Sequence, residues 1–349
     1  MTTLSQRSRS QALRAIRVTG GFRSIGDSRW RGRRLLILGY HGVALEDEHE
    51  WDPALYISRP RLESQLLTLR SAGCTVLPLA EALAALEDGS LPPRSVAITF
   101  DDGNHDFHER AFPILQSLGL PVTVYLTTYY CDYEAPVFKP MCNYLLWKGR
   151  DRTVALADLT GSNESFNLRT SDGRMQAFAA LLQLADREHY SGADQQHMVE
   201  RLASALHIDF GRLMARRILQ IMRPSSVRQL AAAGVDFQLH THRHRAPVNR
   251  DLFMKEIEEN RTRIQQLTGK RPSHFCYPSG NFRAEFLKWL EEAQVVSGVT
   301  CDPGLVNAKS HRLLLPRFVT TEGVSPLVFE GWLTGAADWL PRRRTHAYR

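Results

Sequence analysis

Short apolar runs alternate with amphipathic stretches along most of the chain. Between the apolar runs lie segments with apolar side chains at helical spacing, two of which end at Gly73 and Gly119, a common helix terminator. Strands are predicted over residues 35–40, 75–77, 95–100, 121–127, 235–239, 273–277 and 295–300, and helices over 61–72, 79–86, 107–118, 251–267 and 285–293. This alternation predicts parallel βαβ units, and therefore an open α/β sheet or a βα barrel.

The alternation stops between about residues 129 and 222. No convincing strand is predicted there, and the clearest features are helical stretches at 176–185 and 198–206. We interpret this region as a helical insertion into a βα loop. Active sites of βα folds lie at the carboxyl ends of the strands, where such insertions grow. The insertion could therefore form part of a substrate wall or serve only as a packing subdomain, and the sequence leaves both open.

The composition is that of a folded protein with one large domain or two ordinary ones. The 349 residues are 43% hydrophobic and 23% charged, which supports a core and excludes disorder as the main state. No apolar run approaches the length of a membrane span, and no apolar segment follows the first arginines as in a secretory signal. Five cysteines without a CxxC spacing fit a reducing compartment. We therefore expect a cytoplasmic protein.

The net charge of +7 is unevenly distributed. Residues 1–34 hold nine arginines and one aspartate, a charge of +8, and residues 341–349 hold four arginines and no acid, a charge of +4. The remaining residues therefore carry −5. We expect solvated basic termini on a mildly acidic body, which argues against a nucleic-acid partner because such a protein usually carries a basic face on its folded body. Attraction of the N-terminal arm to anionic lipid stays open.

Two adjacent carboxylates follow a predicted buried strand, in the run Thr99-Phe100-Asp101-Asp102-Gly103. Neighbouring carboxylates repel, so keeping both ionised requires a cation or strong hydrogen bonds. One aspartate on a metal and the other acting as a base would satisfy that requirement. A turn or a helix N-cap would suit Asp-Asp-Gly equally well.

Three histidines follow a second predicted strand, at His240, His242 and His244. Histidine is a common ligand of zinc-like metals. An extended chain would place all three on one face, whereas a turn would bring His240 and His244 together and leave His242 aside. An incidental surface cluster is the alternative interpretation. A third segment, residues 273–280, ends in a Pro/Gly turn that is weak by itself.

Taken in this order, the three segments resemble the polysaccharide deacetylases of the NodB-homology type. Residues 99–103 match that family's first motif, His240-Thr241-x-x-His244 matches the second, and residues 275–280 resemble the third. Residues 39–43 and 303–317 are similar to parts of its exopolysaccharide-associated branch. The resemblance implies a distorted (β/α) barrel over residues 35–335, with the helical insertion at about 129–222. A basic arm (1–34) and a basic tail (336–349) would flank it.

The resemblance also implies roles for individual residues. Asp101 would be the general base, and Asp102, His240 and His244 would bind a divalent metal, with zinc the expected ion. Three protein ligands leave a position for water and substrate, as in catalytic sites. The backbone N–H of Tyr277 would bind the oxyanion on the substrate.

This chain departs from the family pattern at two positions. Many members orient the base with an arginine in the third motif, where this chain has Cys276, and Arg317 is the candidate replacement. The late histidine that protonates the departing amine has no clear match. His311 is the nearest candidate for the general acid. His41, which would also contact the substrate, and His242 are its rivals.

The sequence therefore predicts a metal-dependent hydrolase that removes N-acetyl groups from an amino-sugar glycan or a lipid-linked precursor. A related barrel amidohydrolase acting on a small amide or cyclic ureide is one alternative. An inactive glycan-binding module is the other. We expect no nucleic-acid partner, and peripheral association with the inner membrane surface through residues 1–34.

Overall fold

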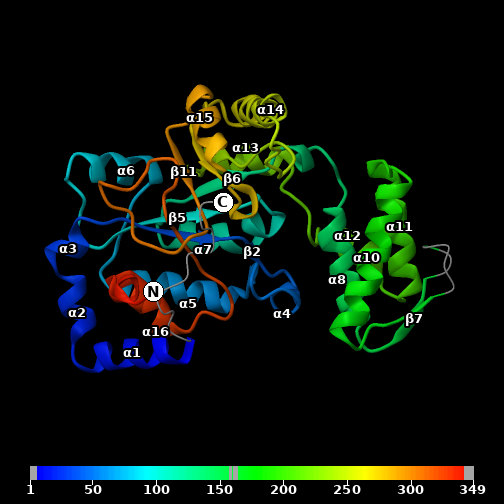
Figure 1. The fold of residues 1–349 in the computed structure, drawn as a ribbon, viewed down its shortest axis with the longest axis horizontal. Helices are drawn as coiled ribbons and strands as arrows, with labels where there is room; N and C mark the ends of the chain where they lie inside the picture. The colour runs from blue at the N-terminus through cyan, green and yellow to red at the C-terminus, as the bar shows by residue number, and fades with distance from the viewer. Residues whose placement is uncertain (1–5, 157–158, 160–163, 342–349) are drawn as a thin grey trace.

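A parallel sheet of eight strands forms the centre of the molecule in the computed structural model, which describes residues 6–156, 159 and 164–341 (Figure 1). The strand order is β11-β10-β9-β6-β5-β1-β12, and β4 pairs with the start of β5. The strands are β1 (Leu36–Tyr40), β4 (Thr75–Val76), β5 (Ser95–Phe100), β6 (Thr123–Leu126), β9 (Asp236–Leu239), β10 (His274–Cys276), β11 (Ser297–Val299) and β12 (Phe318–Val319). The seven predicted strands are all present in this sheet.

Residues 312–319 connect the two edges of this sheet. Leu315 bridges to Val299 of β11 in parallel, and Phe318 pairs in parallel with Leu38 of β1. Because one short segment contacts both edges, the strands curve round into a distorted α/β barrel. The predicted fold class is confirmed.

Helices on the outside of the sheet bury its apolar face. Their apolar side chains join the strands in one hydrophobic core. The elements are α4 (Glu48–Trp51), α5 (Arg59–Ser71), α6 (Leu79–Glu87), the π-helix η1 (Phe107–Ala111), α7 (Phe112–Ser117), α13 (Pro224–Ala232), α14 (Arg250–Thr268), the 3-10 turn η3 (Pro278–Gly280), α15 (Ala284–Glu292) and α16 (Pro326–Thr334), with a small sheet of β2 (Gly42–Val43) and β3 (Tyr56–Ile57). The longest, α14, begins where the Asn249 side chain accepts the Leu252 N–H, and it ends at Gly269 with φ 73°.

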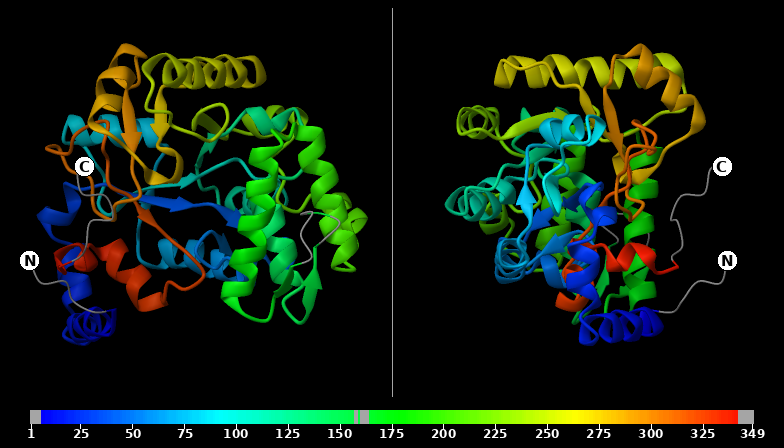
Figure 2. Two further views of the ribbon diagram at one scale, coloured as in Figure 1. Left: turned by 45° about the vertical axis from the view of Figure 1, so that its right-hand side comes forward. Right: turned by 90° about the vertical axis from the view of Figure 1, so that its left-hand side faces the viewer.

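The insertion predicted over residues 129–222 has its own hydrophobic core, separate from that of the barrel. It contains η2 (Tyr129–Cys131), α8 (Phe138–Lys148), β7 (Thr153–Ala155), β8 (Ser165–Asn167), α10 (Ser171–Arg187), α11 (Gly192–Ala205) and α12 (Phe210–Ala215). Figure 2 shows these helices together at one side of the barrel. The expectation that the region lacks strands is wrong, since β7 and β8 form an antiparallel pair. Each buries a single side chain, Val154 or Phe166, which is too little to give a periodic signal.

Residues 6–34 are packed on the barrel, so the expectation of a solvated N-terminal arm is wrong for them. They form α1 (Gln6–Val18), α2 (Gly21–Gly26) and α3 (Arg29–Gly32). Leu13, Phe22 and Ile25 enter the main core, and Arg31 is fully buried. The predicted C-terminal tail begins with the 3-10 turn η4 (Ala336–Trp339), whereas its residues 342–349 lie outside the described part. Within the described residues, no helix combines the length and the apolar character that crossing a membrane requires.

Candidate active site

A sharp turn at the end of β5 separates the two predicted carboxylates. The Asp101 N–H donates to the Tyr40 carbonyl at 2.9 Å, next to the end of β1. Asp102 and Gly103 then adopt left-handed backbones, with φ of 67° and 80°. A Cβ on Gly103 would lie 2.2 Å from Leu126 Cδ1, so this position requires glycine. The turn lets the two neighbouring carboxylates reach different partners.

Asp101 is held by a buried arginine from the segment that closes the barrel. Arg317 donates from Nη1 to Asp101 Oδ1 at 2.6 Å and from Nη2 to Asp101 Oδ2 at 2.5 Å. The two residues are 0% and 2% exposed. Burial opposes ionisation of Asp101, but the Arg317 guanidinium outweighs it and lowers the pKa of Asp101 to about 2. Asp101 is therefore ionised at neutral pH, which is the state that its predicted role as general base requires.

Cys276 and His41 complete the surroundings of Asp101. The Cys276 Sγ lies 3.2 Å from Arg317 Nη2 and 3.6 Å from Asp101 Oδ2. His41 Nε2 lies 3.4 Å from Asp101 Oδ2. The structure thus brings both Arg317 and His41 to Asp101. The guanidinium reaches the carboxylate from position 317, while the shorter Cys276 side chain occupies the third-motif position.

Asp102, His240 and His244 converge beside this pair. Asp102 Oδ1 lies 3.2 Å from His240 Nε2 and 3.2 Å from His244 Nε2, and the ligand atoms of all three lie within 4.8 Å of one another. Left-handed backbones at Thr241 (φ 63°) and His244 (φ 54°) turn the chain. His242 instead contacts the Thr128 hydroxyl, with Nδ1 and Oγ1 2.8 Å apart. Of the two geometries left open by the sequence, the turn is the one observed.

The donor atoms of this cluster fit a divalent cation. His240 Nδ1 lies 2.8 Å from the Cys276 carbonyl, which can only accept, so Nδ1 carries the proton and Nε2 of the neutral ring offers a lone pair. Asp102 Oδ1 is buried and has no hydrogen-bond donor among the described residues. Lone pairs from a carboxylate and two imidazoles that face one another would be satisfied by a cation bound between them. Such a mixed N/O set suits zinc and other first-row divalent ions.

The charges around Asp102 agree with this interpretation. Burial opposes ionisation of Asp102, but the facing His244 and His240 hold its pKa below the ordinary value. Burial also lowers the pKa of His244, which favours the neutral ring that binds metals. Asp102 and His244 are therefore disposed to be in their ligand forms near neutral pH. Burial lowers the pKa of His240, but the facing Asp102 and Asp101 carboxylates outweigh it and raise that pKa, so His240 gives up a proton when a metal binds.

Two side chains of α14 that the sequence analysis did not single out bind the backbone of residues 240–244, the loop that carries the histidines. Asn260 is completely buried, and its Oδ1 accepts the His240 N–H at 3.0 Å while its Nδ2 donates to the Leu126 carbonyl at 2.9 Å. One turn earlier, the Glu256 carboxylate accepts the Arg243 N–H at 2.7 Å. Asn260 thereby ties the end of β9 to the end of β6. No local pattern marks these residues, because their partners are distant in sequence.

Tyr277 and His311 are not directed at this cluster. The Tyr277 N–H faces the Val299 carbonyl at 3.4 Å, within the β10–β11 ladder, and its hydroxyl donates to the Leu313 carbonyl at 2.9 Å. His311 is exposed and its Nδ1 accepts the Leu313 N–H at 3.2 Å. The next residue, Arg312, accepts from Gly298 of β11, so His311 lies near the amino end of that strand. The structure does not bring His311 to the carboxyl ends, where Asp101 and His240 lie.

The chain folds as a distorted α/β barrel. At its strand ends an aspartate–arginine pair lies beside an aspartate and two histidines, and this combination indicates a hydrolase of the deacetylase class. The family model "Polysaccharide deacetylase" matches residues 88–167 and 193–297, just over half of the chain. The chain belongs to the polysaccharide deacetylase family, which confirms the resemblance found in the sequence. The unmatched stretch between the two ranges falls inside the insertion.

Named relatives are similar over part of the chain. A poly-β-1,6-N-acetyl-D-glucosamine N-deacetylase of Staphylococcus aureus is 30% identical over 125 residues, which are 33% of this chain and 43% of the relative. One of Escherichia coli is 31% identical over 98 residues, 28% of this chain and 14% of the relative. The matches therefore span less than half the length of these curated relatives.

Solved structures with the same fold cover most of the chain. The Streptococcus pyogenes deacetylase PplD, in complex with acetate, has a TM-score of 0.56 at 17% identity, over 86% of this chain and 98% of its own. IcaB from Ammonifex degensii has a TM-score of 0.54 at 16% identity, over 88% of this chain and 97% of its own. At these identities the comparison supports the fold.

Proposed function

We propose that this protein is a metal-dependent polysaccharide N-deacetylase that removes acetyl groups from N-acetylglucosamine units of a β-1,6-linked glycan. The observation that carries the proposal is the buried Asp101–Arg317 pair beside the Asp102–His240–His244 cluster. The linkage is taken from the names of the curated relatives, which are similar to a third of this chain.

Asp102, His240 and His244 would hold the divalent ion, with zinc the expected metal. When bound, it would polarise the acetamide carbonyl and acidify a water molecule. Asp101 then accepts a proton from that water, most directly at Oδ2, the oxygen that faces His41. Because Arg317 keeps Asp101 ionised, the base is ready before substrate binds.

The departing amine needs a proton, and His41 is placed to supply one. Its Nε2 lies 3.4 Å from Asp101 Oδ2, so a proton taken up by Asp101 has a short path to the ring. The His41 side chain is 16% exposed. His311 lies at the other end of β11, so we favour His41 over it for this role. His41→Ala should lower kcat strongly, whereas His311→Ala should stay close to wild type.

The test is acetate release by zinc-loaded protein from β-1,6-linked and β-1,4-linked N-acetylglucosamine oligomers of equal length. We expect faster release from the β-1,6 oligomer, and almost none with Asp101→Asn although that variant still binds zinc. Equal rates for Asp101→Asn and wild type would contradict the mechanism. Release from both oligomers at the same rate would show that the enzyme does not select the β-1,6 linkage. The proposal would then be limited to N-deacetylation of the glycan.

The two alternatives give other outcomes in the same assay. A barrel amidohydrolase would turn over a small amide or cyclic ureide and neither oligomer. A glycan-binding module would bind an oligomer without releasing acetate. Retention of Asp101 together with Asp102, His240 and His244 disfavours that module, because the base and all three ligand side chains are in place.

A further inference from the structure

The N-terminal helices present arginine to solvent at the end of the barrel opposite the candidate active site. Residues 6–34 contain a single acid, Asp27. Six arginines of residues 6–34 are exposed, and Arg17 among them pairs with Glu330. The other five form what we call the basic N-terminal surface: Arg7, Arg14, Arg23, Arg29 and Arg33. Of these, Arg23 comes near Asp27, at 3.9 Å, and its side chain is 90% exposed.

The C-terminal end of the described residues lies against the N-terminal helices. Helix α1 packs beside α16 near the C-terminus, as both views of Figure 2 show. Arg9 Nη1 donates to the carbonyl of Pro341, the last described residue, at 2.9 Å. In the sequence, Pro341 is followed directly by three arginines, at positions 342–344. The last described residue therefore contacts α1, in an N-terminal segment that is basic while the rest of the chain up to residue 340 is acidic.

The apolar side chains of these helices already pack against the barrel. Leu13, Phe22 and Ile25 are buried in the main core, so the arginines of the basic N-terminal surface face outward. Contact of this surface with a partner must therefore be mainly electrostatic. Val18 is 82% exposed at the end of α1, and Trp339 is 57% exposed where it packs edge-on against Trp30 of α3. Arginine with nearby exposed tryptophan is typical of surfaces that contact lipid headgroups.

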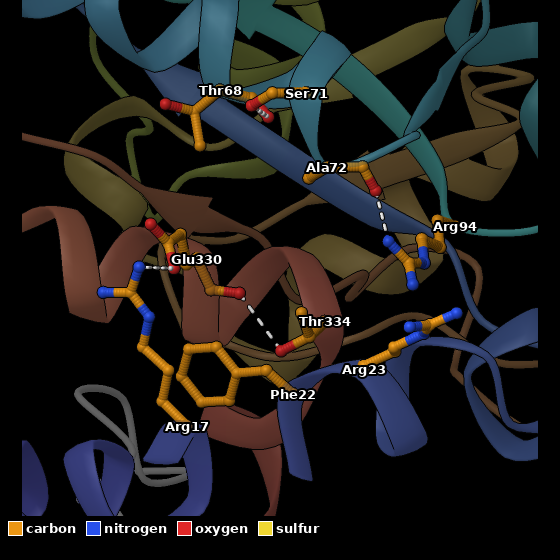
Figure 3. Close-up of a pocket in the computed structure, with 9 residues that line it drawn as sticks. All are labelled: Arg17, Phe22, Arg23, Thr68, Ser71, Ala72, Arg94, Glu330 and Thr334. Carbon is orange, nitrogen blue, oxygen red and sulfur yellow. Dashed lines mark hydrogen bonds and ion pairs between the residues drawn. The ribbon is translucent and has the colours of Figure 1, made fainter. Parts of the chain in front are cut away.

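The pocket beside this surface is not a specific phosphate site (Figure 3). It has a volume of about 410 Å³ between α1, α2, α5 and α16. Two of the three guanidinium groups that line it are already paired, Arg17 with Glu330 at 3.3 Å and Arg94 with Asp27 at 2.7 Å, and the third belongs to Arg23 of the basic N-terminal surface. The Thr68 hydroxyl donates to a helix carbonyl. The anion-binding capacity therefore lies in the outward-facing arginines.

We propose that the basic N-terminal surface binds the protein to an anionic lipid membrane. Each arginine near such a membrane adds attraction that falls off within a Debye length of about 8–10 Å. Five arginines against one acid thus give appreciable binding at low salt and weak binding at high salt. Nucleic acid is disfavoured because the rest of the chain carries a net negative charge.

The attachment fixes the direction in which the candidate active site faces. Arg31 of α3 donates to the Ser95 carbonyl at 3.2 Å, at the amino end of β5, whereas Asp101 follows its carboxyl end. The catalytic mouth would therefore open away from the lipid. This corollary rests on the proposed function, and it favours a glycan chain in the aqueous phase over a sugar linked to lipid in the same membrane.

Co-sedimentation of the 349-residue chain with vesicles tests the proposal. The vesicles are phosphatidylcholine alone or with 30% phosphatidylglycerol, at about 50 mM and 500 mM salt. We expect binding to the anionic vesicles at low salt only. The triple variant Arg14→Glu, Arg23→Glu, Arg29→Glu should bind at least tenfold more weakly. The charge-matched control Arg150→Glu, Arg169→Glu, Arg187→Glu changes exposed arginines of the insertion and should bind as wild type.

Three outcomes would overturn the proposal. They are equal binding to both vesicle types, equal loss in the control variant, and binding to a DNA duplex as tight as to anionic vesicles at the same salt. Unfolding curves that match wild type exclude a folding defect as the cause. Deletion of residues 1–34 is unsuitable, because it would expose the core that Leu13 and Phe22 cover. The measurement does not use catalysis, so its failure leaves the proposed function standing.

Discussion

Replacing Arg317 with methionine would remove the charge that faces Asp101 while keeping an unbranched side chain in the same space. Asp101 would lose both charge-assisted hydrogen bonds and stay buried. Raising its pKa from about 2 to only the ordinary 3.8 corresponds to about 2.4 kcal/mol, and unopposed burial raises the pKa further. Removing one partner of a buried ion pair costs about 3–5 kcal/mol. We therefore expect Arg317→Met to lower the free energy of unfolding at pH 7 by about 3 kcal/mol.

The assay is denaturant unfolding of metal-free protein, so that bound metal does not contribute. Because the pKa of Asp101 is depressed in the folded state, its ionised form stabilises the protein above the unfolded-state pKa. This contribution is lost as pH falls through the folded-state pKa of about 2. In Arg317→Met the buried Asp101 takes up a proton at a higher pH than in the wild type, so the stability difference between the two proteins should be larger at pH 7 than at pH 3.

A double-mutant cycle separates the ion pair from general packing. Asp101→Asn combined with Arg317→Met leaves no uncompensated carboxylate and should recover at least 1 kcal/mol relative to Arg317→Met alone. Arg317→Lys keeps the charge without the bidentate geometry and should fall between wild type and Arg317→Met. Equal stability of wild type and Arg317→Met, or no recovery in the double variant, would refute the reasoning.

Three further predictions concern the candidate metal ligands and the turns that support them. In a zinc titration followed with an optical indicator, His244→Ala should no longer bind one equivalent of zinc. His242→Ala, from the same loop, should still bind it. Equal zinc content in the two variants would contradict the ligand assignment. Asn260→Ala should weaken zinc binding by about 10–100-fold, because the His240 backbone loses its anchor, while Thr262→Ala on the exposed side of α14 should leave the affinity unchanged. Gly103→Ala should destabilise the fold by about 1–3 kcal/mol in thermal unfolding, since its φ is 80° and a Cβ would meet Leu126, and wild-type stability would show that the turn relaxes.

Most of the barrel could be predicted because its strands are continuous apolar runs. Strands buried on both faces of a parallel sheet, such as Leu36–Tyr40, leave a strong local signal. β12 could not be found this way, since Phe318 and Val319 form a strand only through pairing with β1. The N-terminal helices were missed for another reason. Their few core side chains, including Leu13, stand among arginines that dominate the composition.

The site was predictable where its residues are neighbours in sequence. Asp101 with Asp102 and His240 with His244 form short patterns at strand ends, and the structure brings these residues together. Asn260 could not be identified from the sequence, because its partners, the His240 N–H and the Leu126 carbonyl, lie 20 and 134 residues away. A buried asparagine on an amphipathic helix has no local signature. His311 was predicted as the general acid because it comes late in the chain, as the family's histidine does. That sequence position does not determine whether the side chain lies near the carboxyl ends of the strands.

Arg317 also couples the electrostatics of the site to closure of the barrel. Its Nε donates to the Thr300 carbonyl at 3.1 Å, beyond β11, and its Nη1 lies 3.1 Å from Thr99 Oγ1 on β5. The side chain therefore connects the closing segment to strands on both sides while it pairs with Asp101. What the buried Asp101 carboxylate requires is a guanidinium within reach, and in this chain position 317 supplies it. A closing segment that passes beside Asp101 meets this requirement, which leaves position 276 free to be a cysteine.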